Sequence, residues 1–504
     1  MHLRPVAFLL CALGCALTPF SACGQTQQTV TVDAHAPAHP FPHFWEQMFG
    51  SGHAVLALRD AYRRDLTEVH DKVGMRYVRF HGILDDEVGV YGEDEKGNPV
   101  YNFTYVDQIY DGLLDRGVRP MVEISFMPYA LAAHRDIQAF WYKPNVSPPK
   151  SYAAWDALMK AFAQHLVERY GIDEVSKWYF EVWNEPNIDF WAGDPKQQTY
   201  FELYEHTARD LKAVSPRLRV GGPTTSSAHW IPEFLKFVSD NHVPIDFVSS
   251  HGYADDTVKD MFRTDEEIPM RDRVCRAIRM VRGQIDDSAM PKLPLMWTEW
   301  NVPSYGDLNA RDNWYVGPAL AHDIRQCDGA VTMMSWWTFD DVFEEGGVPR
   351  EPFDGGFGLI ASGSIRKPSF YDFQLLHTLG DERLANSADD VLVTRRKDGT
   401  LVVAAWNLVD MDKAAEGKPL EMHLAFKGVP RNARVTLERV DEHHGNPMIA
   451  YRAMSSPTYP TRAQIAALNK ASTLPPPEEM KLADGKLTIT LGVNALAVME
   501  IRPE

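Results

Sequence analysis

Two neighbouring segments decide the fold: YAAWDALMKAFAQHLVERYG (Tyr152–Gly171) and WYFEVWNEP (Trp178–Pro186). The first segment repeats apolar side chains at helical spacing, at Trp155, Leu158, Phe162 and Leu166. This spacing predicts an amphipathic helix. The second segment is a short apolar and aromatic run that ends in polar residues, which predicts a buried strand. Together they form one helix-then-strand unit.

The same unit recurs through residues 41–380 of the chain. The expected strands span residues 44–50, 77–82, 119–128, 178–186, 219–225, 244–254, 295–301 and 329–339. Amphipathic helical segments separate them, and Gly or Pro ends most of these segments. Eight βα units in sequence predict an α/β fold, a closed (β/α)8 or TIM barrel.

The pattern changes after Gly380. Residues 391–408 read as two strands joined by Asp-Gly, a strong hairpin signal, and later segments alternate apolar and polar side chains in the same way. Residues 381–504 therefore predict an accessory antiparallel β-sandwich. Residues 25–40 precede the barrel without a helix of their own, and we expect their strand to join the sandwich.

The first 24 residues have the composition of a secretory signal. Arg4 is followed by an apolar run from Val6 to Leu17 and then by small residues. Two cleavage routes stay open: a lipobox-like Phe20–Cys23 that would leave a lipid anchor on Cys23, or cleavage by the general signal peptidase. We expect a secreted or periplasmic protein without a membrane span.

Composition limits the partners. The chain of 504 residues has a net charge of −18 and a pI of about 5.5. This charge argues against nucleic acid or an anionic membrane surface as a partner and suits a neutral substrate. Outside the signal, the two cysteines are Cys275 and Cys327. Both fall on expected helices close to the apolar face, which favours two buried free thiols over a disulfide.

Polar residues gather at the carboxyl ends of the expected strands, where a barrel of this kind holds its chemistry. They are Arg79 and His81 on the second strand, Asn184 and Glu185 on the fourth, His251 and Tyr253 on the sixth, and Glu299 on the seventh. Two carboxylates flanked by tryptophans at strand ends are the parts of a glycoside hydrolase. One of them must hold a proton near neutral pH and the other must not.

Five segments resemble those of glycoside hydrolase family 39, the β-xylosidase and α-L-iduronidase family of the clan of retaining barrels. EVWNEPN (residues 181–187) resembles its acid/base motif and TEWN (298–301) its nucleophile motif. RFHGI (79–83), SSHGY (249–253) and WWTFDDVFEE (336–345) resemble its substrate-binding segments. The resemblance covers most of the chain beyond the signal. It implies a cofactor-free, metal-free exo-glycosidase of β-D-xylosides or xylooligosaccharides.

The resemblance also implies roles for residues. Glu185 is expected as general acid/base, Glu299 as nucleophile and Asn184 as donor to the sugar 2-hydroxyl. The other expected sugar-binding residues are His81, Phe126, His251, Tyr253, Tyr305, Trp337, Glu344 and Glu345. Arg79 has two open alternatives: it holds Glu299 ionised, or it pairs with Glu181 or Glu123 inside the barrel.

Other functions remain as alternatives. One is a related glycosidase that acts on an α-L-iduronide or an α-L-arabinoside. Another is a non-catalytic carbohydrate-binding barrel, which should have lost a catalytic carboxylate, and neither is lost here. A third, a metal-dependent hydrolase using His81 and His251, lacks the His-x-His pattern after the first strand.

Overall fold

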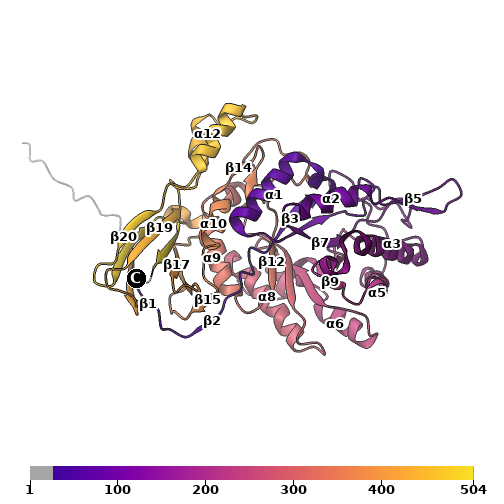
Figure 1. Ribbon diagram of the computed structural model, residues 1–504, viewed down its shortest axis with the longest axis horizontal. Helices are drawn as coiled ribbons and strands as arrows, with labels where there is room; N and C mark the ends of the chain where they lie inside the picture. Colours follow the sequence, from indigo (N-terminus) through magenta and orange to yellow (C-terminus); the bar gives the residue numbers. More distant parts are fainter. Residues whose placement is uncertain (1–25, 503–504) are drawn as a thin grey trace, which may run out of the picture.

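The structure, a computed structural model, describes residues 26–502. It contains a barrel of parallel strands at one end of an elongated molecule and β-sheets at the other (Figure 1). The expected signal segment and the lipid-anchor position Cys23 lie outside the described residues.

The barrel closes in the order β10-β11-β12-β3-β4-β7-β8-β9, with each neighbouring pair parallel. Its strands are β3 (Met48–His53), β4 (Tyr77–His81), β7 (Arg119–Ile124), β8 (Tyr179–Val182), β9 (Arg219–Thr225), β10 (Phe247–His251), β11 (Leu295–Trp300) and β12 (Met333–Trp336). The predicted barrel is confirmed. The first strand begins four residues later than expected, because Phe44 and Trp45 pack with Phe41 in a turn below the barrel.

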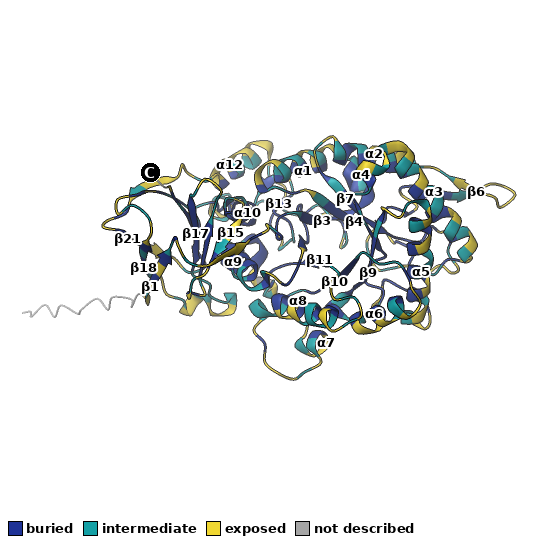
Figure 2. Cartoon of the chain, turned by 60° about the horizontal axis from the view of Figure 1, so that its bottom comes forward, coloured by how far each residue is buried: buried dark blue, intermediate teal, exposed yellow. Residues whose placement is uncertain are grey.

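Helices surround the barrel, and its strands form the buried centre (Figure 2). The long helices are α1 (Asp60–Val73), α2 (Thr104–Leu114), α3 (Tyr152–Tyr170), α5 (Lys196–Val214), α6 (Ile231–Asp240), α8 (Met270–Asp286), α9 (Val316–Cys327) and α10 (Pro368–Leu376). Shorter ones are α4 (Ile172–Val175) and α7 (Val258–Phe262). In α3 the Ser151 hydroxyl accepts a hydrogen bond from the Ala154 backbone N–H, and Gly171 ends the helix at φ +78°.

Two further sheets lie beside α9 and α10 and share one apolar core. One holds β1 (Thr26–Asp33), β18 (Leu420–Lys427) and β21 (Lys486–Leu491). The other, in spatial order, holds β2 (Ala38–Pro40), β15 (Glu382–Leu384), β16 (Val391–Arg395), β17 (Leu401–Trp406), β22 (Leu496–Ile501), β19 (Arg434–Val440) and β20 (Glu478–Lys481). β1 pairs in parallel with β18, so the N-terminal strand lies among the C-terminal ones.

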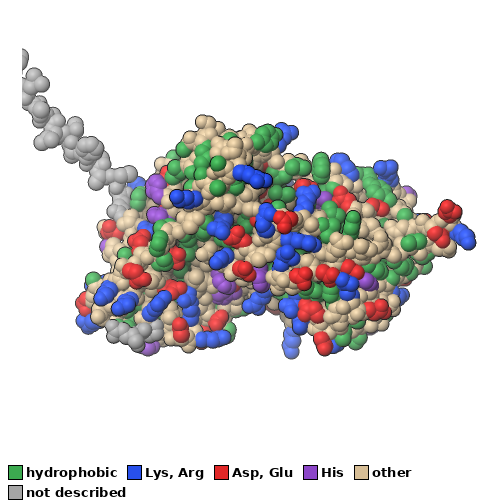
Figure 3. Space-filling model, turned by 45° about the horizontal axis from the view of Figure 1, so that its top comes forward, with side chains coloured by type: hydrophobic (Ala, Val, Ile, Leu, Met, Phe, Trp, Pro, Cys, Tyr) green, Lys and Arg blue, Asp and Glu red, His purple; other side chains and the backbone are tan. Residues whose placement is uncertain are grey.

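Small elements decorate this plan. The hairpins are β5 (Tyr91–Glu93) with β6 (Pro99–Tyr101), and β13 (Ile360–Ala361) with β14 (Ile365–Arg366). The helices α11 (Met448–Ala453) and α12 (Arg462–Ser472) lie between β19 and β20. Acidic and basic side chains are interspersed over the face that Figure 3 shows. Of the helices within residues 26–502, none has both the length and the apolarity that a membrane span requires.

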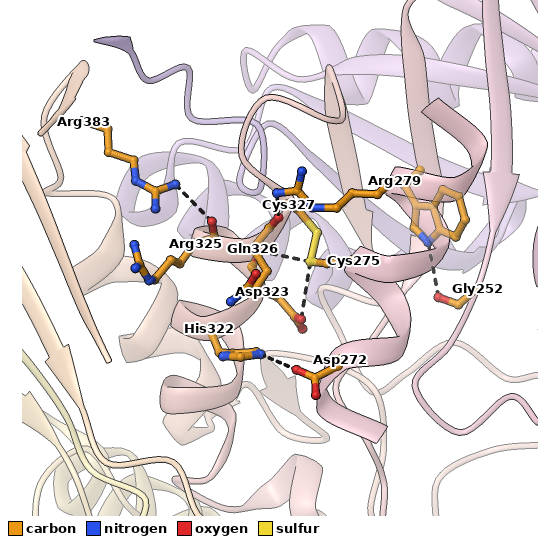
Figure 4. The surroundings of a disulfide bond; sticks show 11 residues. Gly252, Asp272, Cys275, Arg279, His322, Asp323, Arg325, Gln326, Cys327 and Arg383 are labelled. Carbon is orange, nitrogen blue, oxygen red and sulfur yellow. Dashed lines mark hydrogen bonds and ion pairs between the residues drawn. A yellow bond between two sulfur atoms is a disulfide. The ribbon is translucent and has the colours of Figure 1, made fainter. Parts of the chain in front are cut away.

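The free-thiol prediction is wrong, because Cys275 and Cys327 form a disulfide (Figure 4). Cys275 lies on α8 and Cys327 ends α9, and these two helices pack side by side. Their packing brings the two Cα atoms to 5.0 Å, within the range that a disulfide spans. A sequence gives no such distance between two helices separated by 52 residues. Since α8 precedes β11 and α9 follows it, the bond joins the two helices around the strand of Glu299.

We expect the double variant Cys275→Ser/Cys327→Ser to lose roughly 2–4 kcal/mol of unfolding free energy, because the long loop in the unfolded chain is no longer closed. Urea unfolding of the variant and the oxidised wild type measures the difference. Wild-type protein unfolded in the presence of a reductant is the matched control and should approach the variant. Equal stability of variant and oxidised wild type would contradict a stabilising bond.

Candidate active site

The barrel brings the two predicted glutamates together. Glu185 follows β8 and Glu299 lies near the end of β11. One carboxylate oxygen of each, together with a ring nitrogen of His251, lies within 4.8 Å of the others. Glu185 and Glu299 are 9% and 5% exposed, so both carboxyl groups lie in a largely desolvated site.

Glu185 has the environment of a proton donor. Its backbone has φ +42°, and its N–H donates to the Thr224 carbonyl oxygen at 3.0 Å, which fixes the turn after β8. Its side-chain oxygen Oε1 lies 3.0 Å from Nδ1 of His251. Burial raises the pKa of Glu185 to about 7, although His81 and Arg79 oppose the shift. Burial lowers the pKa of His251 to about 4, so this imidazole is neutral and does not draw the proton away by its charge.

Glu299 has stronger donors. Nη1 of Arg79 donates to Oε1 at 2.6 Å, and the Tyr253 hydroxyl donates to Oε2 at 2.7 Å. Burial raises the pKa of Glu299, and the neighbouring His251 and Arg79 oppose that shift. Because both oxygens accept hydrogen bonds, one of them from a cation, Glu299 is the more acidic of the two glutamates. The pair thus divides into an acid and a carboxylate.

Arg79 satisfies both alternatives left open by the sequence. It is fully buried, and besides Glu299 it pairs with Glu181 through Nε at 2.6 Å and with Glu123 through Nη2 at 2.7 Å. Nη2 also donates to Oδ1 of Asn184 at 3.0 Å. This contact orients the Asn184 amide so that its NH2 group remains available as a donor.

His81 forms a second buried cation in the site. Its Nδ1 lies 2.8 Å from Glu123, and its Nε2 lies 3.6 Å from Glu345 and 4.0 Å from Glu299. Burial alone lowers the pKa of His81, but the charge and hydrogen bond of Glu123 outweigh burial and raise it to about 10. Both cations of this cluster, Arg79 and His81, are therefore paired with carboxylates.

Aromatic rings wall the site beside these charges. The Trp337 ring lies 4.8 Å from the His81 ring and under the Arg79 guanidinium, and the Phe126 ring lies 5.9 Å from His81. A Cβ at Gly50 would approach Trp337 to 2.1 Å, so only glycine admits this ring position. The neighbouring Trp336 packs edge-on against rings outside the barrel, Trp300 and Phe373, because successive strand residues face opposite sides.

Two predicted binding residues, Glu344 and Tyr305, have partners of their own in this structure, and their sugar-binding roles stay predictions. Both Glu344 oxygens are bonded to Arg59, and one also lies 3.3 Å from His53, so this carboxylate is occupied while Glu345 faces His81. The sequence could not reveal the distant partner Arg59. The Tyr305 ring packs edge-on against Tyr315 rather than against either catalytic glutamate, because the chain turns away after β11.

Some residues of the site were not predicted as site residues. Glu123 and Glu181 were weighed only as partners of Arg79, yet they hold the cluster through Ser125 and Thr298 as well. A charged residue inside an apolar strand was the signal for both. Phe140 and Phe190 add rings beside His81, and they lie on loops where the sequence shows no periodic signal.

Glu185, His251 and Glu299 have the residue types of a divalent-ion site, and so do His43, Glu46 and His377 below the barrel. The absence of a metal stays a prediction for both groups. For the catalytic group, Arg79 already supplies the positive charge that ionised Glu299 needs.

Comparison with known proteins agrees with the geometry. Residues 28–483 match the model of glycosyl hydrolases family 39, and the chain belongs to this family of glycoside hydrolases. A "Beta-xylosidase" of Geobacillus stearothermophilus is 40% identical over 474 residues, which cover 92% of this chain and 93% of that protein.

Two solved structures are similar over nearly the whole chain. A monomeric β-xylosidase from Caulobacter crescentus CB15 has a TM-score of 0.83 at 33% identity, covering 94% of this chain and 99% of that one. A GH39 enzyme from Xanthomonas axonopodis pv. citri has a TM-score of 0.84 at 32% identity, covering 97% and 100%.

The raised pKa of Glu185 predicts an alkaline limit on activity. Since only the protonated form gives its proton to a leaving group, kcat/KM for a glycoside with a poor leaving group should fall as the pH rises through about 7. Glu185→Gln cannot titrate at this position, so its residual kcat/KM on the same substrate should show no such limb. A limb that persists unchanged in Glu185→Gln would assign it to another group.

Proposed function

We propose that this protein is a retaining exo-glycosidase that hydrolyses β-D-xylosides, including xylooligosaccharides. The observation that carries the proposal is the spacing of Glu185 and Glu299, whose nearest oxygens lie within 4.8 Å. Retaining glycosidases place their two carboxyl groups about 5–5.5 Å apart, whereas inverting enzymes leave room for a water between them at about 6.5–9.5 Å.

In the proposed mechanism Glu299 attacks the anomeric carbon while Glu185 protonates the departing glycosidic oxygen. Arg79 and Tyr253 hold the attacking carboxylate, and the neutral His251 keeps Glu185 in place. The covalent glycosyl-enzyme forms as the aglycone leaves. Ionised Glu185 then takes a proton from water, which opens the intermediate with overall retention. Asn184 donates to the sugar 2-hydroxyl, a contact that strengthens as the anomeric carbon becomes positive.

The charges favour a neutral pentose over a uronide. A carboxylate on ring carbon 5 would need an unpaired cation or several backbone donors in this buried site. Arg79 and His81 are both paired with carboxylates, and Glu345 adds negative charge beside them. A cavity of about 380 Å³ lies among residues 341–357, and Arg350, which lines it, is exposed. The extensive likeness to a protein named β-xylosidase supports the same choice.

We further propose that the protein acts outside the cytoplasm, either secreted or periplasmic, with a lipid anchor on Cys23 as one form of it. The disulfide supports an oxidising compartment, because such bonds are rare where thiols are kept reduced. The two C-terminal sheets would serve as an accessory β-sandwich that packs on α9 and α10.

The sugar is tested by kcat/KM on four aryl glycosides: β-D-xyloside, β-D-glucoside, α-L-iduronide and α-L-arabinoside. We expect the xyloside to be cleaved fastest and the arabinoside weakly, with no loss after treatment with a chelator. A preference for the iduronide would overturn the assignment and indicate Arg350 as the carboxylate partner. Loss of activity with the chelator would support the metal-dependent alternative.

The roles of the two glutamates are separated by truncation. Glu299→Ala should lose turnover on every substrate, because no glycosyl-enzyme can form. Glu185→Ala should lose about 10²–10⁴-fold on poor leaving groups and far less on activated ones.

Azide should partly rescue Glu185→Ala by attacking the intermediate, and proton NMR should show a first product of retained configuration. If Glu185→Ala lost equal activity across leaving groups and azide had no effect, the roles assigned to the two glutamates would be wrong. An inverted product would exclude the covalent route.

A further inference from the structure

A fully buried lysine, Lys367, lies directly before helix α10. Nζ of Lys367, at the start of α10, is 2.6 Å from Asp312, 3.1 Å from Asp341 and 2.8 Å from the Gly356 carbonyl oxygen. Lys367 is 0% exposed, and the two aspartates are 1% and 3% exposed. A buried ammonium requires three acceptors, and this one has three. Nothing in the proposed chemistry uses it.

The aspartates hold a glycine-rich segment, residues 354–358. Asp312 accepts from the Gly355 N–H at 2.8 Å, and Asp341 accepts from the Gly358 N–H at 2.6 Å. A Cβ at Gly356 would lie 2.4 Å from Asp341, so the backbone can approach the carboxylate only without a side chain. The ion cluster therefore fixes the path of this segment.

Phe357 is the residue that the segment presents to the site. Its carbonyl oxygen accepts hydrogen bonds from Trp336 Nε1 at 3.0 Å and Asn301 Nδ2 at 3.2 Å. Its ring packs edge-on against Tyr253, with 6.2 Å between centroids, and the Arg311 guanidinium covers it at 4.2 Å. The Tyr253 hydroxyl in turn donates to the nucleophile, Glu299.

We propose that Lys367 is a positioning residue for the nucleophile. Through Asp312 and Asp341 it fixes the glycine-rich segment, so that the Phe357 ring holds the Tyr253 hydroxyl against Glu299. The inference rests on the proposed role of Glu299 and extends the catalytic apparatus to a cluster that does not contact the sugar. Loss of the cluster weakens the hydrogen bond from Tyr253 to Glu299, which lowers kcat. Because the ionised form of Glu299 then has one donor fewer, the fall of kcat/KM at acid pH (the acid limb) moves to higher pH.

The test compares three variants, Lys367→Met, Asp341→Asn and Phe357→Ala, each made in the wild type and in a Tyr253→Phe background. Phe357→Ala keeps the buried cluster, and Asp341→Asn keeps an oxygen that accepts from the Gly358 N–H. Both variants should therefore fold even if Lys367→Met does not. Phe353→Ala is the matched control. Phe353 directly precedes the glycine-rich segment in the sequence, but its ring packs against Tyr451.

We expect Phe357→Ala to lower kcat about tenfold with little change in KM, and to shift the acid limb to higher pH. Lys367→Met should show the same pattern, and Asp341→Asn should show it more weakly. In the Tyr253→Phe background each loss should shrink below about twofold, because the hydroxyl being positioned is gone. Phe353→Ala should lower Tm and leave the acid limb in place.

Additive losses in the two backgrounds, or an acid limb that does not move in Phe357→Ala and Asp341→Asn, would overturn the inference. The substrate is whichever of the four aryl glycosides the wild type cleaves fastest. The substrate preference of the wild type alone therefore tests the xyloside assignment. The comparison of each variant in the wild-type and Tyr253→Phe backgrounds tests the role of the cluster separately.

Discussion

The site depends on one buried guanidinium. Arg79 meets Glu299, Glu181 and Glu123 at 2.6–2.7 Å and also binds Asn184. A charge of this kind, removed from water, is tolerated only when its donors are matched, and removal of one partner of a buried pair costs about 3–5 kcal/mol. Arg79 thus sets the ionisation of the nucleophile and the orientation of Asn184 with one side chain. The carboxylates come from β7, β8 and β11, so the cluster requires the closed barrel that brings these strands together.

The two glutamates differ because their neighbours differ. Both carboxyl groups are buried, and burial raises the pKa of each. His251, which burial keeps neutral, lies 3.0 Å from Glu185 and 3.6 Å from Glu299, but only Glu299 is also hydrogen-bonded to a cation and a phenol. The proposed separation into acid and nucleophile therefore follows from which strand supplies which donor, and not from the residue type.

The sequence was sufficient for features set by periodicity and strand ends. Alternating apolar runs predicted the barrel, and the strand-end rule placed Glu185, Glu299, His81, His251 and Tyr253 on one face. Features that depend on distances across the fold were not predictable. The Cys275–Cys327 bond requires the packing of α8 on α9, and the partner of Glu344 is Arg59, 285 residues away. The contact of Tyr305 with Tyr315 was not predictable for the same reason, because no periodic pattern fixes the loop after β11.

The backbone of residues 354–358 belongs to no helix or strand, so side-chain hydrogen bonds have to fix its path. Lys367 forms ion pairs with two aspartates, and each aspartate accepts a hydrogen bond from a backbone N–H of residues 354–358. Arg79 has the same arrangement, in which one buried cation holds carboxylates from separate elements. The Arg79 cluster reaches the Tyr253–Glu299 hydrogen bond through direct contact with Glu299, and the Lys367 cluster reaches it through Phe357. Electrostatic preorganisation of the nucleophile is in this way shared between the barrel strands and the loop above them.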